Sequence, residues 1–211
     1  NKPCFAILKR APTDARFVPL LLAARFQMTA LVRHPEARFV RLQLRQNRVL
    51  KSMTAAQWAE LEPLLEVTDY AKGAPLENQG DESMQQYFIL DGILKRVVSS
   101  PAGKEMILRF AAETEIDTSY AAWRLKTPMP YSIRAVTRAR TARLAMEDWV
   151  AFINRHPAIK NQFEFAVMKL MSEVMAHTIT LHLLDAPGRL ARFTRKHEDL
   201  LGRIPKKELA S

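Results

Sequence analysis

Three carboxylates gather in one short stretch of the sequence, at Glu113, Glu115 and Asp117. Grouped carboxylates can serve acid–base catalysis or hold a cation. Here no histidine or serine is spaced to complete a catalytic group with them, and their spacing fits no calcium loop. We therefore expect a solvated acidic loop, and we expect no enzyme because no other nucleophile–base pair stands out in the sequence.

Two histidines, His177 and His182, have the side chain for metal, haem or proton chemistry. They are five residues apart, so they do not share the helix face of a metal-binding pair at i and i+4. We expect no metal site. A basic stretch further on could contact nucleic-acid phosphates or be an ordinary charged face; it comprises Arg189, Arg192, Arg195 and Lys196.

The positive charge of the chain is concentrated near its start. The net charge is +10, and residues 1–50 carry ten basic and two acidic residues, a net +8. The excess therefore says little about DNA binding by the rest of the chain. We expect residues 1–46 to be a poorly ordered basic extension; a phosphate-binding arm, a targeting segment and an upstream extension from an early start site stay open.

The sequence also excludes whole classes of protein. A single cysteine among 211 residues excludes a disulfide framework and a four-cysteine cluster. No apolar run approaches the roughly 18 residues of a membrane span, so we expect no membrane partner. One cysteine fits a reducing compartment, and we expect a cytoplasmic protein.

The elements that must position these side chains change type along the chain. A capping box at Thr54 and Gln57 predicts a short helix. Turn signals then recur about every ten residues, which favours an antiparallel barrel or sandwich. The expected strands cover residues 87–90, 93–98, 106–110, 133–136 and 142–146.

A long helix follows, expected over residues 158–185. One row of its residues steps by alternating fours and threes, the a/d seam of a helix that pairs with its own copy. This predicted dimer interface comprises Phe163, Val167, Leu170, Val174, His177, Leu181 and Leu184. A second row lies on an adjacent stripe and comprises Met168, Met171, Met175, Thr178 and His182. We expect one face to meet the partner chain and the other to cover the barrel.

These features together resemble the CRP/FNR family of bacterial transcription regulators. Residues 79–81, 87–92 and 103–108 resemble its cyclic nucleotide-binding jelly roll. Residues 184–191 resemble the hinge after its dimerisation helix, and residues 204–211 resemble the first helix of its winged helix-turn-helix. The resemblance covers about residues 47–211.

We expect an α+β fold in four parts. Residues 1–46 form the basic extension, which lies outside the resemblance, and the resemblance implies an antiparallel jelly roll over residues 47–157. Residues 158–185 form the dimerisation helix, with a two-state hinge at Asp185–Gly188, and residues 186–211 a partial helix-turn-helix. A homodimer is implied, and in the family the region of Lys104 and Glu105 can touch RNA polymerase.

The phosphate-binding cassette departs from the family pattern. Members that bind cyclic AMP carry a Gly-Glu-Leu stretch and, about ten residues on, an Arg-Ser pair. Here those places read Thr118-Ser119-Tyr120 and Met129-Pro130, so the phosphate loses its arginine. Cyclic AMP is therefore not expected, and no haem ligand can be located, so no cofactor is predicted. The effector pocket is expected at Thr118, Ser119, Tyr120, Met129, Ser132, Met171, Met175 and Thr178.

The sequence thus predicts a dimeric regulator whose effector acts through the long helix and hinge on a DNA-binding domain. The DNA-proximal residues are expected to be Arg189, Arg192, Lys206 and Lys207. Base reading would need a recognition helix after Ser211. The alternatives are an interaction module that does not read DNA and a haem-based gas sensor.

Overall fold

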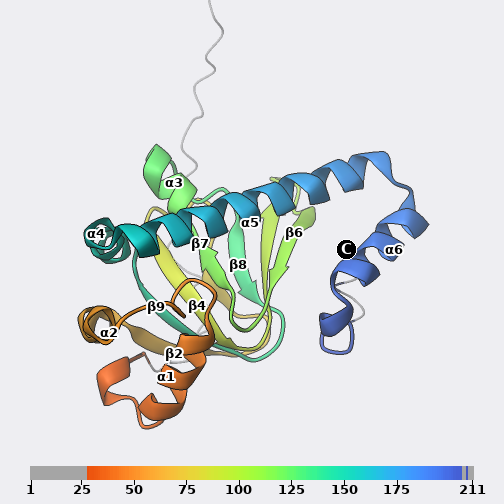
Figure 1. Ribbon diagram of the computed structural model, residues 1–211. Helices are drawn as coiled ribbons and strands as arrows, with labels where there is room; N and C mark the ends of the chain where they lie inside the picture. Colours follow the sequence, from red (N-terminus) through yellow and green to blue (C-terminus); the bar gives the residue numbers. More distant parts are fainter. Residues whose placement is uncertain (1–27, 206–207, 209–211) are drawn as a thin grey trace, which may run out of the picture.

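The computed structural model describes residues 28–205 and 208, in which a β-roll is crossed by one long helix (Figure 1). Two antiparallel sheets make up the roll. The five-stranded sheet has the order β1 (Thr29–Ala30), β2 (Glu66–Tyr70), β9 (Ala139–Ala145), β4 (Gln85–Asp91) and β7 (Ile116–Thr118). The four-stranded sheet has the order β3 (Pro75–Glu77), β8 (Ser132–Ala135), β5 (Leu94–Ser99) and β6 (Glu105–Ala111).

The antiparallel jelly roll predicted from the sequence is confirmed. The five expected strands correspond to β4, β5, β6, β8 and β9. The turn between β4 and β5 contains Gly92 at a φ of 88°, where a Cβ would lie 2.2 Å from the carbonyl oxygen of Arg138. Only glycine avoids both the strained backbone and that collision.

Helices pack around the roll, and they come from both the start and the end of the described chain. The first are η1 (Leu31–Arg33), α1 (Ala37–Gln46), α2 (Ala55–Leu61) and η2 (Glu62–Leu64). The predicted capping box at Thr54 is present, with Gln57 N donating to Thr54 Oγ1 and Thr54 N donating to Gln57 Oε1. After β7 come α3 (Tyr120–Leu125), α4 (Met146–Arg155), α5 (Pro157–Leu183), α6 (Ala186–Lys196) and η3 (Glu198–Leu200).

The expected poorly ordered extension to residue 46 is corrected for its described part. Residues 28–46 contain β1, which pairs with β2, and α1, whose Val40 and Leu44 are fully buried. Because these side chains remove apolar surface from water, this segment belongs to the roll's core. Residues 1–27 lie outside the described residues.

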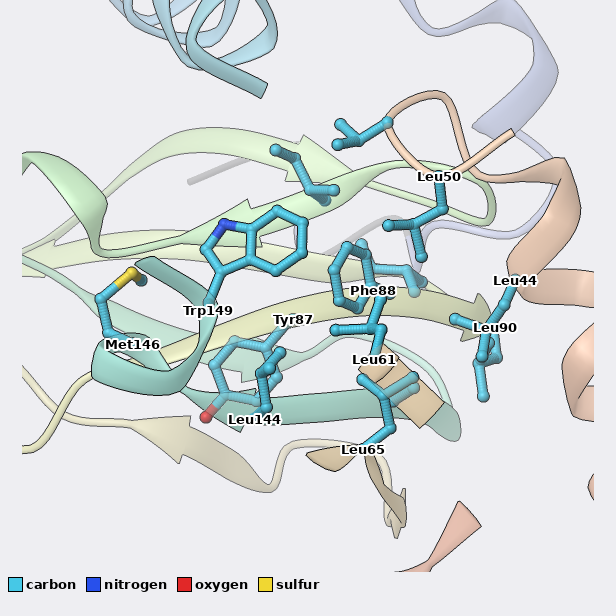
Figure 2. Close-up of a cluster of buried hydrophobic side chains, with 14 of the residues drawn as sticks. Leu44, Leu50, Leu61, Leu65, Tyr87, Phe88, Leu90, Leu144, Met146 and Trp149 are labelled. Carbon is cyan, nitrogen blue, oxygen red and sulfur yellow. The ribbon is translucent and has the colours of Figure 1, made fainter. Parts of the chain in front are cut away.

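The core lies between the five-stranded sheet and the helices that cover it. Trp149 of α4 packs edge-on against Phe88 of β4, with ring centroids 5.4 Å apart. Leu44 of α1, Leu50 of the following turn and Leu61 of α2 close the same cluster (Figure 2). The N-terminal segment, the roll and α4 therefore share one core. No described helix is long and apolar enough to cross a membrane.

Candidate functional site

The predicted effector pocket centres on the chain between β7 and β8. This connection forms α3, which ends at Lys126 in the left-handed conformation (φ 54°) and is followed by Pro128 and Pro130. Met129 is tied to the neighbouring turn, since its N–H donates to Asp81 O and its carbonyl accepts from Gly80 N. The positions that correspond to the family's phosphate-binding cassette therefore lie on two segments, which we call its two arms. The first arm is β7 with the start of α3, and the second arm contains Met129 and Tyr131.

An internal ion pair lies between these two arms. Arg96 of β5 is fully buried and places its Nη2 2.6 Å from Asp117 Oδ1 and 3.0 Å from the carbonyl oxygen of Thr118. Burial alone would lower the pKa of Arg96, but Asp117 and Tyr131 outweigh it and the net pKa is raised. The guanidinium therefore stays charged and is neutralised by its own chain.

Tyr131 closes the same space from the second arm. Its ring centroid lies 4.5 Å from Arg96 Cζ, and its hydroxyl donates to Thr118 O over 2.8 Å. Burial raises the pKa of Tyr131 to about 12, with Arg96 acting in the opposite direction. Arg96, Asp117 and Tyr131, which we call the internal clamp, hold both arms of the cassette together.

A second buried carboxyl borders the clamp. Glu77 of β3 is only 4% exposed; its Oε1 accepts from Gln85 N, and its Oε2 has no hydrogen-bond partner among the described residues. Burial raises the pKa of Glu77 to about 8, and the charge of Asp117 adds to the rise. The Glu77 carboxyl is therefore mostly protonated at neutral pH, and a protonated Oε2 is a hydrogen-bond donor.

The expected solvated acidic loop is corrected by these contacts. Asp117 is fully buried in β7 against Arg96, and Glu115 pairs with Arg109 at 3.1 Å. Glu113 accepts from Gly92 N over 2.7 Å. The carboxylates are structural partners of arginines and a backbone amide, and these partners lie on other segments of the chain.

The predicted pocket residues do not form one cavity. Thr118, Ser119, Met129 and Ser132 are buried in the wall of the roll, where Ser132 Oγ accepts from Gln79 N. Tyr120 packs edge-on against Phe163 and donates to Glu164 of α5. Met171 and Met175 are exposed on α5, and Thr178 donates to the carbonyl of Val174 in its own helix. In the single chain neither methionine faces the roll, and their assignment to a pocket stays a prediction.

Sequence reasoning missed Arg96 and Tyr131. The available signal was a charged residue within the apolar run of residues 93–98, two positions from Leu94. In a strand, residues two apart share a face, so a buried Leu94 places Arg96 inward as well. A buried arginine then requires a carboxylate partner, which Asp117 supplies from β7 of the facing sheet.

Part of the predicted dimer seam of α5 packs on the roll instead, while for Val174, Leu181 and Leu184 the dimer contact stays a prediction. Phe163 and Leu170 are buried against the roll, and Val167 packs onto the same core. His177 Nε2 lies 3.1 Å from Ile107 O on β6. For Phe163 and Leu170 the prediction of a dimer contact is therefore wrong. Both rows of α5 are apolar, so spacing alone could not tell which one covers the roll.

The exposed apolar row, which we call the α5 ridge, lies on the face turned away from the roll. Met168 and Met175 are 63% and 61% exposed. The full ridge comprises Phe165, Met168, Met171, Met175, Ile179 and Leu183. Exposed apolar side chains in such a continuous row are typical of an interaction surface.

The hinge is shorter than expected. Leu184 is extended and Asp185 caps α6, accepting from Gly188 N over 2.9 Å. Ala186–Gly188 therefore form the first turn of α6. Arg189 and Arg192 are exposed on that helix, while Lys206 and Lys207 lie outside the described residues.

Comparison with protein families matches residues 67–156 to the cyclic nucleotide-binding domain. The roll and its long C-terminal helix have the jelly-roll fold of that domain. Comparison with curated proteins gave no match. Among the described residues, no group of three histidine, cysteine or acidic side chains could hold a metal ion.

Solved structures share this fold at low sequence identity. The global regulator CLP of Xanthomonas campestris, which responds to c-di-GMP, matches with a TM-score of 0.59 and 14% identity, over 72% of this chain and 74% of that one. The catabolite activator protein of Thermus thermophilus matches with a TM-score of 0.54 and 18% identity, over 64% and 63%.

A Ruegeria pomeroyi protein assigned to cyclic nucleotide binding matches with a TM-score of 0.52 and 21% identity, over 71% of this chain. This chain spans 64% of the length of that protein. The structural neighbours therefore include transcription regulators of the CRP/FNR type, and at these identities the likeness concerns the fold.

Proposed function

We propose that the chain is a dimeric transcription regulator of the CRP/FNR type that senses an effector other than cyclic AMP. Two copies pair through α5, and the state of the roll is relayed along α5 and the hinge to a DNA-binding element. The observation that carries this proposal is the α5 ridge, which extends from Phe165 to Leu183 and ends beside the hinge.

The ridge supports a second copy of the same chain as the occupant. A 27-residue helix is about 40 Å long, so its apolar side chains form an extended stripe. A helix of this length with such a stripe buries it against an identical helix in a twofold interface. The methionines suit this role because their flexible thioethers adapt to the facing side chains.

The cassette supports an effector other than cyclic AMP. A cyclic phosphate needs a cation and backbone donors, and Pro130 has no N–H to offer. The nearby guanidinium of Arg96 is already paired with Asp117, and Tyr131 covers it. We propose likewise that the roll holds no haem, for which the visible absorbance of the purified protein is the direct test.

The C-terminal segment supports a role next to DNA. Arg189, Arg192 and Arg195 are exposed on α6 with Lys196, directly after the hinge. Exposed arginines and lysines on a helix contact the phosphates of DNA and fix a protein's position on the duplex.

The experiment is to map genomic sites bound by the protein expressed from its own gene, using chromatin immunoprecipitation. Discrete sites are expected, and Met171→Asp with Met175→Asp should abolish them because half-sites need a dimer. Leu125→Asp, at an exposed leucine of α3, is the matched control and should keep them. Absence of sites for the natural protein supports the interaction module instead.

A further inference from the structure

The end of the described chain lies against the roll. After the hinge at Leu184 and Asp185, α6 turns back and runs down beside β6 (Figure 1). β6 is an edge strand of the four-stranded sheet. We call residues 186–205 together with Glu208 the C-terminal segment.

The contact has a small apolar centre. Ile204 is 4% exposed and packs with Ile107 and Phe110 of β6 in a cluster separate from the main core. Phe193 of α6 meets Phe110 edge-on, with centroids 5.6 Å apart. No residue of α6 is fully buried, so the segment rests on the surface of the roll. Such shallow burial contributes far less than a domain core does.

Two ion pairs fix the segment on either side of this centre. Lys95 Nζ of β5 lies 2.5 Å from Glu208 Oε2, and the two side chains are 12% and 14% exposed. The Arg203 guanidinium grips the Glu113 carboxylate with contacts of 2.5 and 2.9 Å. Burial raises the pKa of Glu113, but the bonds from Arg203 and Gly92 outweigh it, so the net pKa is lowered and the pair stays ionised.

We propose that this face of the roll is a docking surface for the chain's own C-terminal segment, and that the two ion pairs form a latch that a polyanion opens. In the docked state Arg203 is committed to Glu113 and is unavailable to phosphates. A polyanion competes with Glu113 for Arg203 and removes one side of the latch. The partly exposed pairs are screened by salt, so docking is reversible.

The regulatory consequence rests on the proposed function, in which DNA is the polyanion. Docking holds α6 beside the roll and therefore restricts the positions that its exposed arginines can reach. Release leaves α6 joined to the rest of the chain by the two-residue hinge and by the 3.8 Å pair between Lys196 and Glu173 of α5. The latch thus restrains DNA binding, and the roll applies it through Lys95 of β5 and Glu113 of the turn after β6.

Hydrogen exchange measured by mass spectrometry on the full chain tests the docking. Arg203→Glu places a second carboxylate beside Glu113, and the two negative charges repel each other. The C-terminal segment should then leave the roll more often, so the amides of residues 193–204 should exchange about tenfold faster. Glu113→Arg combined with Arg203→Glu should return most of that protection. Arg195→Glu makes the same charge change at an exposed residue of α6 and should leave exchange as in the natural protein.

The outcomes separate the latch from the proposed function. Unchanged exchange in Arg203→Glu, or a charge swap that restores nothing, overturns the latch. Protection of β4 and β9 should stay constant in every variant, which shows that the roll is folded. Heparin, the probe polyanion, should speed exchange in the segment. If the latch opens as described while no genomic sites exist, the regulator proposal fails and the latch stands.

Discussion

Arg96 and Asp117 face each other inside the roll, with Arg96 Nη2 and Asp117 Oδ1 2.6 Å apart and both side chains almost completely buried. They come from strands of different sheets, β5 and β7, so the pair joins the two halves of the roll. A buried ion pair is costly to break, because removing one partner leaves a desolvated charge.

Removing only the arginine should therefore destabilise the protein strongly. Arg96→Met is expected to lower the free energy of unfolding by about 3–5 kcal/mol, because buried Asp117 keeps only the longer 3.8 Å contact with Arg109. Arg96→Met with Asp117→Leu should recover most of the loss. Thermal unfolding of both variants measures the coupling. Equal effects of the single and double substitution would contradict the pairing.

The protonation of Glu77 should make stability fall as the pH rises. Its pKa is about 8 in the folded protein against an ordinary 4.5, so the folded state binds more protons between these values. The stability from this group is therefore fully present below pH 4.5 and is lost as the pH rises through about 8.

Glu77→Gln keeps a neutral side chain at every pH and should remove this dependence. Relative to the variant, the natural protein should lose on the order of a few kcal/mol between pH 5 and pH 9. Denaturant unfolding at both pH values measures the difference. Parallel pH profiles for the two proteins would show that Glu77 does not hold its proton.

The two faces of α5 should respond differently to truncation. Phe163→Ala should lower the free energy of unfolding by about 3–5 kcal/mol, because its ring is buried among Tyr120 and Trp149. Met168→Ala, on the exposed ridge, should leave the stability of the single chain within about 0.5 kcal/mol. Denaturant unfolding of both variants, at protein concentrations below the dissociation constant of the dimer, compares their free energies of unfolding. A large loss for Met168→Ala would contradict the assigned faces.

Cyclic AMP should not stabilise the natural protein. At about 1 mM nucleotide, the expected change in melting temperature is below ~1 °C, because nothing in the cassette pairs the phosphate. Differential scanning fluorimetry with adenosine as the control measures this. A saturable rise of several degrees would show that the internal clamp opens to admit the nucleotide.

The sequence predicted the roll well because strands and turns are local features. Five strands, the capping box at Thr54 and the long helix follow from period and turn chemistry within short windows. Four strands were missed: β1, β2, β3 and β7. β1, β3 and β7 have only two or three residues and therefore carry too little periodicity, while β2 has five residues. The position of α1 in the core was missed because it depends on contacts with β4, far along the chain.

The candidate site could be predicted only in part for the same reason. The lost phosphate-binding arginine can be read from the sequence at Met129, but the internal clamp joins β5, β7 and the loop before β8. The face of α5 that meets the roll likewise depends on how the helix is rotated. His177 shows this, because its partner is a backbone carbonyl 70 residues away.

The central claim is that two chains pair through the α5 ridge, and the mass of the protein in solution tests it most directly. Light scattering on a sizing column should give twice the chain mass of 24.1 kDa for the natural protein and for Leu125→Asp. Met171→Asp with Met175→Asp should elute at the mass of one chain, with unchanged circular dichroism. A natural protein of single-chain mass, or a ridge variant that stays dimeric, would contradict the claim.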